Sequence, residues 1–193
     1  MTTMHAITDF FLEIDALKLV NRKTYVKGGE RVENSAEHSW QLAMACWHLA
    51  EHFNLSVNQE RLIKMALLHD LGEIDAGDTF LYSPKRADAH IEERKGIERL
   101  QSHQGNAITD LLSLWDEQET GDSLETKLLK AVDRLLPFMH NVATQGKAWQ
   151  ENQVKRSQVA AAHAFIQQDF PEMHAWMSEN IQMAVNNGWL KDE

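Results

Sequence analysis

The sequence predicts an all-α protein, and three observations support this prediction. Apolar side chains recur at helical spacing along most of the 193 residues, strand-like alternation is almost absent, and only three prolines interrupt the chain. Hydrophobic residues make up 43% of the sequence, which is enough for a substantial core in a chain of this length. Because no internal repeat or long linker divides the chain, we expect a single domain over residues 1–193.

The first expected helix covers about residues 8–21, where apolar side chains repeat at helical spacing. A polar, glycine-containing loop, KTYVKGGERVEN, is expected to follow it. Asn34 then precedes Glu37 by three positions, a spacing that lets the two side chains cap a helix start. The helix that they open should run through SAEHSWQLAMACWHLAEHF.

The next helix is expected to start near residues 56–58 and to continue through QERLIKMALLHDLG. Gly72 is a reasonable stop for it, because glycine is common just past a helix end. A long loop over residues 73–87 should follow.

Two further helices are expected in the second half of the chain. Residues 88–101 are highly charged and predict a solvated helix, and AITDLLSLWDEQE predicts another. Asp122 and Glu125 form a second expected capping pair, before the helical segment SLETKLLKAVDRLLPFM.

Two prolines mark the last helical segments. Pro137 should bend or interrupt its helix because it has no amide donor. Pro171 suits the first turn of a final amphipathic helix. The apolar stripe expected on that helix consists of Met173, Trp176, Met177 and Ile181.

Charge and composition narrow the function classes. The formal net charge of −10 argues against binding of a nucleic acid polymer, which needs a broad basic face, although locally concentrated positive charge could still bind a small anion. The single cysteine, Cys46, excludes an internal disulfide and is expected to be a buried hydrophobe. No signal-peptide pattern and no apolar run of about 20 residues is present, so we expect no membrane insertion and a cytoplasmic location.

An adjacent His-Asp pair stands at the end of an apolar helical run. Leu62, Met65, Ala66 and His69 occupy positions i, i+3, i+4 and i+7, so His69 continues the stripe that should face the core. Asp70 lies on an adjoining part of the same face. Because burial of an ionised carboxylate costs several kcal/mol without compensation, Asp70 needs a cationic partner or hydrogen-bond donors.

The same pattern recurs on two other helices. Asp133 belongs to a stripe with Leu129, Val132 and Leu136, and His38 lies in the first turns of the helix after Asn34. Two imidazoles and two carboxylates from separate helices would suit one divalent cation, with coordination positions left for water or substrate. A lone His on an apolar face is more often a core residue, and a lone Asp near a helix end is more often a cap, so these explanations stay open here.

Four ordered blocks carry a family resemblance: LKLVNR, ENSAEHS, ALLHDLGEIDAGD and KAVDRL. Their order and spacing resemble those of the HD-domain metal-dependent phosphohydrolases, and in particular the small single-domain branch that includes bacterial 5'-deoxyribonucleotidases. The resemblance covers roughly residues 8–160. It implies a compact HD-domain helical bundle, with the C-terminal helices packed on it. It also implies one divalent metal ion (Co, Mn, Mg, Zn or Fe), and the ligands that it implies are His38, His69, Asp70 and Asp133.

The resemblance also implies roles for three further residues, and the chain departs from the family pattern at a fourth. Arg22 matches an arginine that contacts the substrate phosphate, and Glu73 and Asp78 match acidic residues of the catalytic site. Lys23 stands where the nucleotidase pattern has a tryptophan beside the substrate, so selection of deoxyribose over ribose is an open question. We therefore expect Glu73 and Asp78 to be catalytic and expect Arg22 and Lys23 to bind substrate.

The function expected from the resemblance is metal-dependent hydrolysis of a nucleoside 5'-monophosphate, with a deoxyribonucleotide as the favoured substrate. One alternative is a dinuclear HD oxygenase or phosphodiesterase, in which His90 or His103 would support a second metal. Another is a nucleotide-binding module without turnover. Aromatic residues near the C-terminus are compatible with a homodimer surface. The sequence does not select the metal, base, sugar, oligomeric state or pathway.

Overall fold

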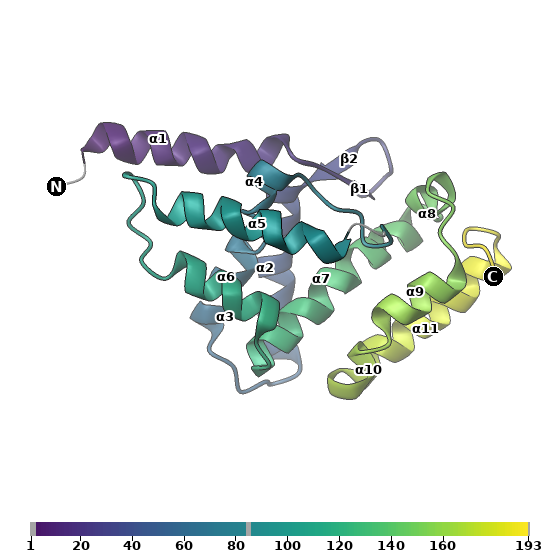
Figure 1. Ribbon diagram of the computed structural model, residues 1–193. Helices are drawn as coiled ribbons and strands as arrows, with labels where there is room; N and C mark the ends of the chain where they lie inside the picture. Colours follow the sequence, from purple (N-terminus) through teal and green to yellow (C-terminus); the bar gives the residue numbers. More distant parts are fainter. Residues whose placement is uncertain (1–2, 84–85, 193) are drawn as a thin grey trace. The chain divides into compact units, whose positions relative to one another are not determined.

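Helices form most of the regular structure in this computed structural model, which describes residues 3–83 and 86–192 apart from the side chains of residues 86–88 (Figure 1). The all-α prediction is therefore confirmed, with a small two-stranded sheet as the exception within the described chain. Residues 84 and 85, in the predicted loop over residues 73–87, lie outside the described residues.

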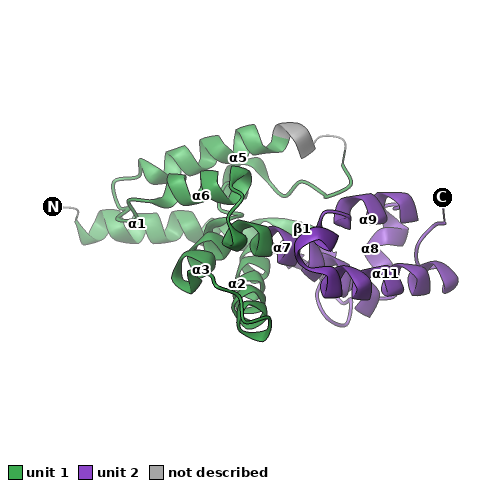
Figure 2. Cartoon of the chain, turned by 90° about the horizontal axis from the view of Figure 1, so that it is seen from below, with its two compact units in different colours: residues 1–22, 34–129 green, residues 23–33, 130–193 purple. Residues whose placement is uncertain are grey.

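The contacts divide the chain into two compact units, coloured separately in Figure 2. Unit 1 comprises residues 1–22 and 34–129, and unit 2 comprises residues 23–33 and 130–193. The single domain over residues 1–193 stays a prediction.

Unit 1 contains a set of packed helices. Helix α2 packs on α3, α3 on α6, and α5 on both α4 and α6. Buried side chains between them include Leu42, Cys46, Leu62 and Met65, so the expectation for Cys46 is confirmed. The helical elements are α1 (Met4–Asp15), the 3-10 turn η1 (Ala16–Leu19), α2 (Ser35–His52), α3 (Gln59–Leu68), α4 (Glu73–Ala76), α5 (Arg86–Gln101) and α6 (Leu111–Thr120).

A hairpin replaces the predicted loop before α2. Strand β1 (Asn21–Tyr25) pairs with β2 (Val32–Asn34), so the helix predicted over residues 8–21 was too long. Gly28 and Gly29 have φ angles of 96° and 73°, which side-chain-bearing residues rarely adopt. They form the tight turn that brings the two short strands together. Strands this short do not produce a long alternating pattern of apolar and polar residues in the sequence.

The predicted cap of α2 is confirmed. The Glu37 amide donates to Asn34 Oδ1 over 2.9 Å, and the Asn34 amide donates to Glu37 Oε2 over 3.2 Å. The two contacts satisfy amides that the first helical turn leaves unpaired.

Helix α3 starts as predicted and ends earlier than predicted. The Asn58 side chain accepts from the Arg61 amide over 3.1 Å, but the helix ends at Leu68 rather than near Gly72. A short helix, α4, then occupies the start of the predicted loop. Gly72 serves close packing, because a Cβ there would lie 2.5 Å from the backbone oxygen of Glu93 on α5.

Helix α7 (Leu124–Ala143) includes residues of both units, and its start differs from prediction. Its start is capped by Ser123, whose hydroxyl accepts from the Thr126 amide over 3.2 Å, and not by the predicted pair Asp122 and Glu125. It also continues through Pro137 without interruption. Since proline has no amide hydrogen, Pro137 cannot donate to the carbonyl of Asp133 one turn earlier.

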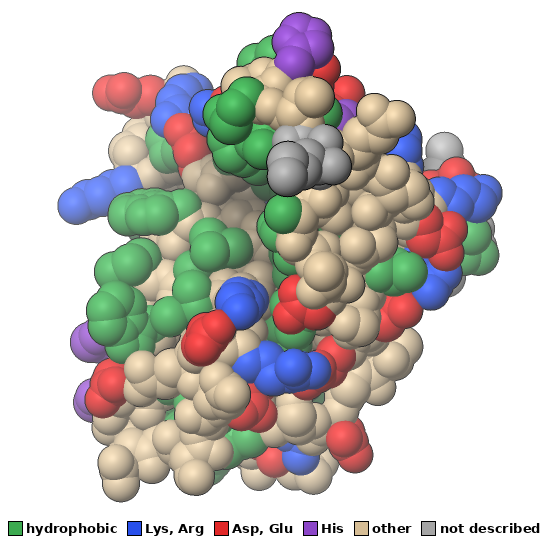
Figure 3. All heavy atoms as spheres, turned by 90° about the vertical axis from the view of Figure 1, so that its left-hand side faces the viewer, with side chains coloured by type: hydrophobic (Ala, Val, Ile, Leu, Met, Phe, Trp, Pro, Cys, Tyr) green, Lys and Arg blue, Asp and Glu red, His purple; other side chains and the backbone are tan. Residues whose placement is uncertain are grey.

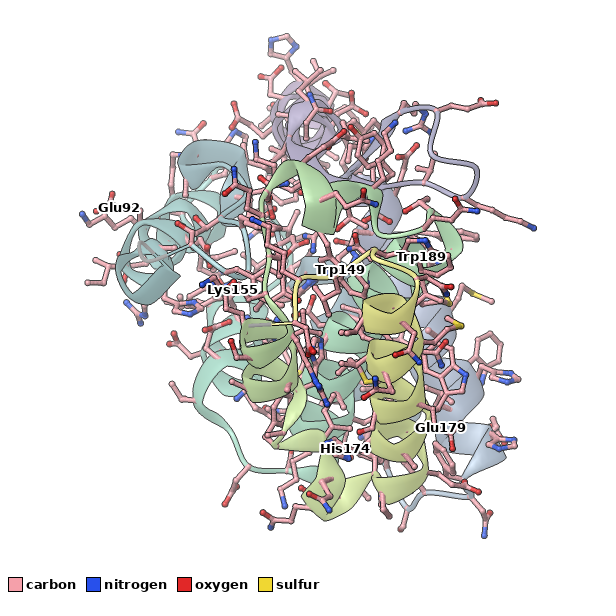
Figure 4. The ribbon with its side chains drawn as sticks, turned by 90° about the vertical axis from the view of Figure 1, so that its right-hand side faces the viewer. Glu92, Trp149, Lys155, His174, Glu179 and Trp189 are labelled. Carbon is pink, nitrogen blue, oxygen red and sulfur yellow. The ribbon has the colours of Figure 1, made fainter. Side chains whose placement is uncertain are left out.

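Unit 2 contains a second set of helices, in which α9 and α11 lie side by side (Figure 4). Pro171 starts α11 as predicted, and Met173, Met177 and Ile181 are buried, whereas 41% of Trp176 is exposed. The Trp176 ring still packs edge-on against Phe138. The helices after α7 are α8 (Lys147–Glu151), α9 (Arg156–His163), α10 (Ile166–Asp169) and α11 (Pro171–Asn186).

Candidate metal centre

His38 lies in the first turns of α2 and is fully buried. Because the cap fixes where α2 begins, it also fixes which side of the helix carries His38. The His38 ring lies 5.3 Å from the His69 ring, measured between their centroids. The structure therefore brings together, within unit 1, two imidazoles that are 31 positions apart in the sequence.

The His69 ring is oriented by its backbone surroundings. His69 directly follows α3, and its Nδ1 lies 3.1 Å from the carbonyl oxygen of Ala66. A carbonyl accepts only, so this contact places a hydrogen on Nδ1 and directs the other ring nitrogen, Nε2, towards the centre. Nε2 is the nitrogen that faces Asp70, 2.9 Å from its Oδ1.

Asp70 is the buried centre of a charged cluster in unit 1. Its Oδ2 accepts from Arg22 Nη1 over 2.8 Å, and the same Arg22 atom lies 3.7 Å from Asp78 Oδ1. Burial alone would raise the pKa of Asp70, but His69 and Arg22 hold that pKa at about 2. Asp70 is therefore ionised at neutral pH, as a metal ligand must be.

Glu73 lies one turn after Asp70, at the start of α4, and its pKa is shifted in the opposite direction. Its Oε2 accepts from the buried Ser35 hydroxyl over 2.6 Å. Burial, and next the nearby charge of Asp70, raise the pKa of Glu73 to about 9, although Arg22 opposes the shift. Two carboxyl groups in one site thus have pKa values on opposite sides of neutrality, an arrangement that is typical of acid-base catalysis.

Asp133 and Lys23 lie in unit 2. Asp133 stands on α7, about one turn past Leu129 at the end of unit 1, and pairs with Arg134 Nη1. Lys23 is exposed on β1, next to Arg22, and neighbouring residues of a strand point to opposite faces. The proposed roles of Asp133 and Lys23 stay predictions.

The buried donor set in unit 1 fits a divalent metal ion. Neutral imidazole nitrogen and ionised carboxylate oxygen are ligands that first-row metals accept, and His38, His69 and Asp70 provide both kinds. A cation would also offset the cost of burying Asp70.

His90 and His103 have other surroundings. The His90 side chain is 42% exposed, and its Nδ1 lies 2.8 Å from Glu119 and 3.5 Å from Glu93. His103 accepts from the Gly105 amide over 3.0 Å, and its ring packs against Phe10. Among the described residues, these contacts give the two histidines structural partners and do not favour a second metal.

Two residues at the centre were not predicted from the sequence. Ser35 contacts Glu73, and the Trp115 indole nitrogen on α6 donates to the His69 carbonyl over 3.1 Å. Ser35 directly follows a recognisable cap, and Trp115 belongs to an apolar run, so both looked like ordinary helix residues. The signal that was present in the sequence is chemical, because a buried hydroxyl or indole N–H needs an acceptor.

The molecular surface agrees with the charge argument on the face drawn in Figure 3. Basic side chains there are interspersed with acidic ones and do not gather into a broad patch. Within residues 3–83 and 86–192, none of the helices combines the length and the apolar character that crossing a bilayer requires.

Comparisons with known proteins show what the chain is similar to. The family described as "HD domain" matches residues 14–174. The "5'-deoxynucleotidase YfbR" of Shigella flexneri is 34% identical over 142 residues, which are 67% of this chain and 69% of that protein. The zebrafish (Danio rerio) "5'-deoxynucleotidase HDDC2" is 29% identical over 135 residues, and the match spans 68% of this chain and 66% of that protein.

A solved structure resembles almost the whole chain. It is a predicted metal-dependent phosphohydrolase from Magnetospirillum magnetotacticum, 34% identical in sequence, with a TM-score of 0.87. The likeness covers 98% of this chain and 96% of the other.

Proposed function

The chain belongs to the HD domain family, and we propose that it is a metal-dependent phosphohydrolase that removes phosphate from a nucleoside 5'-monophosphate. Relatives named as 5'-deoxynucleotidases and a structural neighbour named as a metal-dependent phosphohydrolase support a hydrolytic phosphomonoesterase. The observation that carries the proposal is the buried Asp70 carboxylate, which has an imidazole on one oxygen and a guanidinium on the other.

The metal would be held by His38, His69, Asp70 and Asp133. His38, His69 and Asp70 lie in unit 1, where the two imidazole rings are 5.3 Å apart between centroids, and the family resemblance supports Asp133 as the fourth ligand. When bound, a divalent ion activates a water nucleophile and neutralises charge on the phosphate. The number of ions and their identity stay predictions.

Arg22 is the residue that we assign to the substrate phosphate. Its planar guanidinium presents several donors at fixed angles, which match the oxygens of a phosphate group. Asp70 accepts a hydrogen bond from Nη1, and the Asp78 carboxylate lies 3.7 Å from the same nitrogen. Together the two carboxylates hold the guanidinium in place. Asp78 thus acts on the substrate through Arg22.

Glu73 is the residue that we assign to proton transfer. Since its pKa is raised to about 9, Glu73 carries a proton at neutral pH and can donate it to the leaving oxygen of the nucleoside. The Ser35 hydroxyl occupies Oε2, so Oε1 is the oxygen from which the proton would leave.

Release of inorganic phosphate tests the proposal. The purified protein would be stripped of metal, loaded separately with Co²⁺, Mn²⁺ or Mg²⁺, and assayed with matched ribo- and deoxyribonucleoside 5'-monophosphates. We expect phosphate release that depends on the metal and is abolished by a chelator. Nucleotide binding without phosphate release under every metal would instead identify a binding module.

The sugar and the assembly are finer points of the same proposal. The names of the relatives favour a deoxyribonucleotide, whereas Lys23 occupies the position at which the nucleotidase pattern has tryptophan. The ratio of kcat/KM for a deoxyribonucleotide and its ribonucleotide measures this preference directly. The homodimer stays a prediction, and light scattering coupled to size-exclusion chromatography would test it.

A further inference from the structure

Ser35 is a buried serine whose hydroxyl reaches the proposed proton-transfer residue. Its relative exposure is 0%, and its Oγ donates to Glu73 Oε2 over 2.6 Å. The two residues are 38 positions apart, one at the start of α2 and the other at the start of α4. Both lie in unit 1.

We propose that Ser35 is a positioning residue, which holds the Glu73 carboxyl in the orientation needed for proton transfer. The proposal rests on the proposed function, since it gives Ser35 a role in the same reaction. Ser35 acts through Glu73 and not on the substrate.

The backbone around Ser35 makes it a rigid support. The Ser35 amide donates to the carbonyl of Val20 over 3.0 Å. The capping contacts between Asn34 and Glu37 fix the helix turn around it. With the backbone held in this way, the hydroxyl position depends on a single side-chain torsion.

Glu73, by contrast, needs support. It has three side-chain torsions and sits on α4, a helix of only four residues. Its amide donates to the Asp70 carbonyl over 2.9 Å, which fixes the backbone but leaves the carboxyl group to be held by other contacts. The Ser35 hydroxyl supplies such a contact to the buried carboxyl group.

The contact also distinguishes the two oxygens of Glu73. Because the Ser35 hydroxyl donates to Oε2, that oxygen is engaged in a short hydrogen bond, and Oε1 is left for exchange of a proton with the reactants. An alanine at position 35 would remove this distinction and let the carboxyl group rotate. A threonine would keep the hydroxyl.

The matched control is Ser39, a second buried serine one turn further along α2. Its hydroxyl donates to the backbone carbonyl of Ser35, over 2.9 Å, and not to the Glu73 carboxyl group. Ser35→Ala and Ser39→Ala therefore remove the same atom from the same helix, but only the first removes the donor to Glu73.

The test compares kcat, KM and metal content of these variants. We expect Ser35→Ala to lower kcat about 10- to 100-fold with KM and bound metal unchanged, the range seen when a residue that orients a catalytic group is lost. Ser35→Thr should restore most of kcat, and Ser39→Ala should stay close to the wild type. In a Glu73→Gln background, Ser35→Ala should cause no further loss, because the group that it positions has gone.

Three results would overturn the proposal: an unchanged kcat in Ser35→Ala, equal losses in Ser35→Ala and Ser39→Ala, or full additivity with Glu73→Gln. If Ser35→Ala does not fold, as judged by circular dichroism, Ser35→Cys keeps the volume with a weaker donor and carries the same comparison. Crystal structures of the wild type and the variant give a readout independent of turnover. If the wild type hydrolyses no nucleotide, the proposed function fails, whereas a Glu73 carboxyl that stays in place without the hydroxyl refutes the positioning role.

Discussion

Arg22 Nη1 lies 2.8 Å from Asp70 Oδ2, although the two residues are 48 positions apart. Only about a tenth of each side chain is exposed, so the pair is largely removed from water. A buried carboxylate and a buried guanidinium stabilise each other, and removing one leaves an uncompensated charge. This ion pair joins the proposed phosphate contact to the proposed metal ligand, and it provides the first prediction.

Replacement of Arg22 by lysine should weaken substrate binding. An ammonium keeps the charge but cannot present two parallel donors, so we expect KM for a nucleoside monophosphate to rise about tenfold or more, since roughly 1.4 kcal/mol corresponds to one decade. Steady-state kinetics measure the change. Arg61→Lys, at an exposed pair with Glu117, is the control and should leave KM unaltered. A wild-type KM in Arg22→Lys would remove Arg22 from the phosphate site.

Replacement of Asp70 by asparagine should release the metal. The amide has no negative charge to bind or neutralise a cation, so we expect metal retained after dialysis to fall by at least about tenfold. Elemental analysis by mass spectrometry measures the content. The control is Asp75→Asn, five positions away, where the exposed carboxylate pairs with Arg99. Equal metal in Asp70→Asn and the wild type would contradict the ligand assignment.

Replacement of Glu73 by glutamine should separate metal binding from turnover. The amide preserves shape and polarity but cannot transfer a proton, so we expect unchanged metal content and a kcat lower by about 10²- to 10⁴-fold. Glu92→Gln removes an exposed carboxylate that pairs with Lys95 and should be neutral. Full activity in Glu73→Gln would assign proton transfer to another group.

Replacement of Trp115 by phenylalanine should weaken metal binding, because it removes a hydrogen bond to the backbone of the proposed ligand His69. Phenylalanine fills much of the site but cannot donate to the His69 carbonyl, so the turn that carries His69 loses a support. We expect metal affinity to fall about tenfold and the free energy of unfolding to fall by about 1–3 kcal/mol. Trp149→Phe, in the buried interior of unit 2, should lower stability alone, and titration calorimetry with the metal distinguishes the two variants. If both lost affinity equally, the hydrogen bond would not be the cause.

The buried His163 side chain should make the free energy of unfolding depend on pH. Burial lowers the pKa of this histidine to about 4, so the folded protein binds the proton less readily than the unfolded chain, in which the pKa is near 6.5. Protonation of the unfolded chain should therefore reduce the free energy of unfolding as the pH falls from about 6.5 towards 4, by about 3 kcal/mol in total, and the contribution is fully present above 6.5. Urea denaturation at several pH values measures this slope.

The matched pair for that measurement is His163→Gln and His48→Gln. His163→Gln should flatten the loss between pH 6.5 and 4, because the titrating group is gone, whereas His48→Gln, on the exposed side of α2, should keep it. Parallel curves for His163→Gln and the wild type would show that other groups control stability in this range.

The sequence predicted the features that depend on neighbours along the chain. Three helices start where expected, at the Asn34–Glu37 cap, at the Asn58 cap and at Pro171. A cap supplies acceptors for the free amides of the first helical turn, and proline needs no acceptor there. The periodic stripes also indicated that His69 and Asp70 would be buried. Local interactions of this kind have a fixed spacing and can be recognised in a sequence.

Failures occurred where a longer-range requirement competed with a local pattern. The residues after η1 were assigned to a helix and a loop, but they form a hairpin because Gly28 and Gly29 turn the chain back on itself. Gly72 was interpreted as a helix stop, whereas its role is to let the backbone of Glu93 approach. In each case the competing interaction involves a partner whose position the local pattern does not specify.

By itself, the sequence determined the helical class, the main caps and a set of polar residues that burial would make costly. Only the tertiary structure decided which groups meet: Arg22 with Asp70, Ser35 with Glu73, and Trp115 with the His69 carbonyl. A helix or a cap depends on groups a few residues apart, so its free energy is largely set by the local sequence. A contact across about 40 residues is set by the packing of several helices at once, and no short stretch of sequence contains that information.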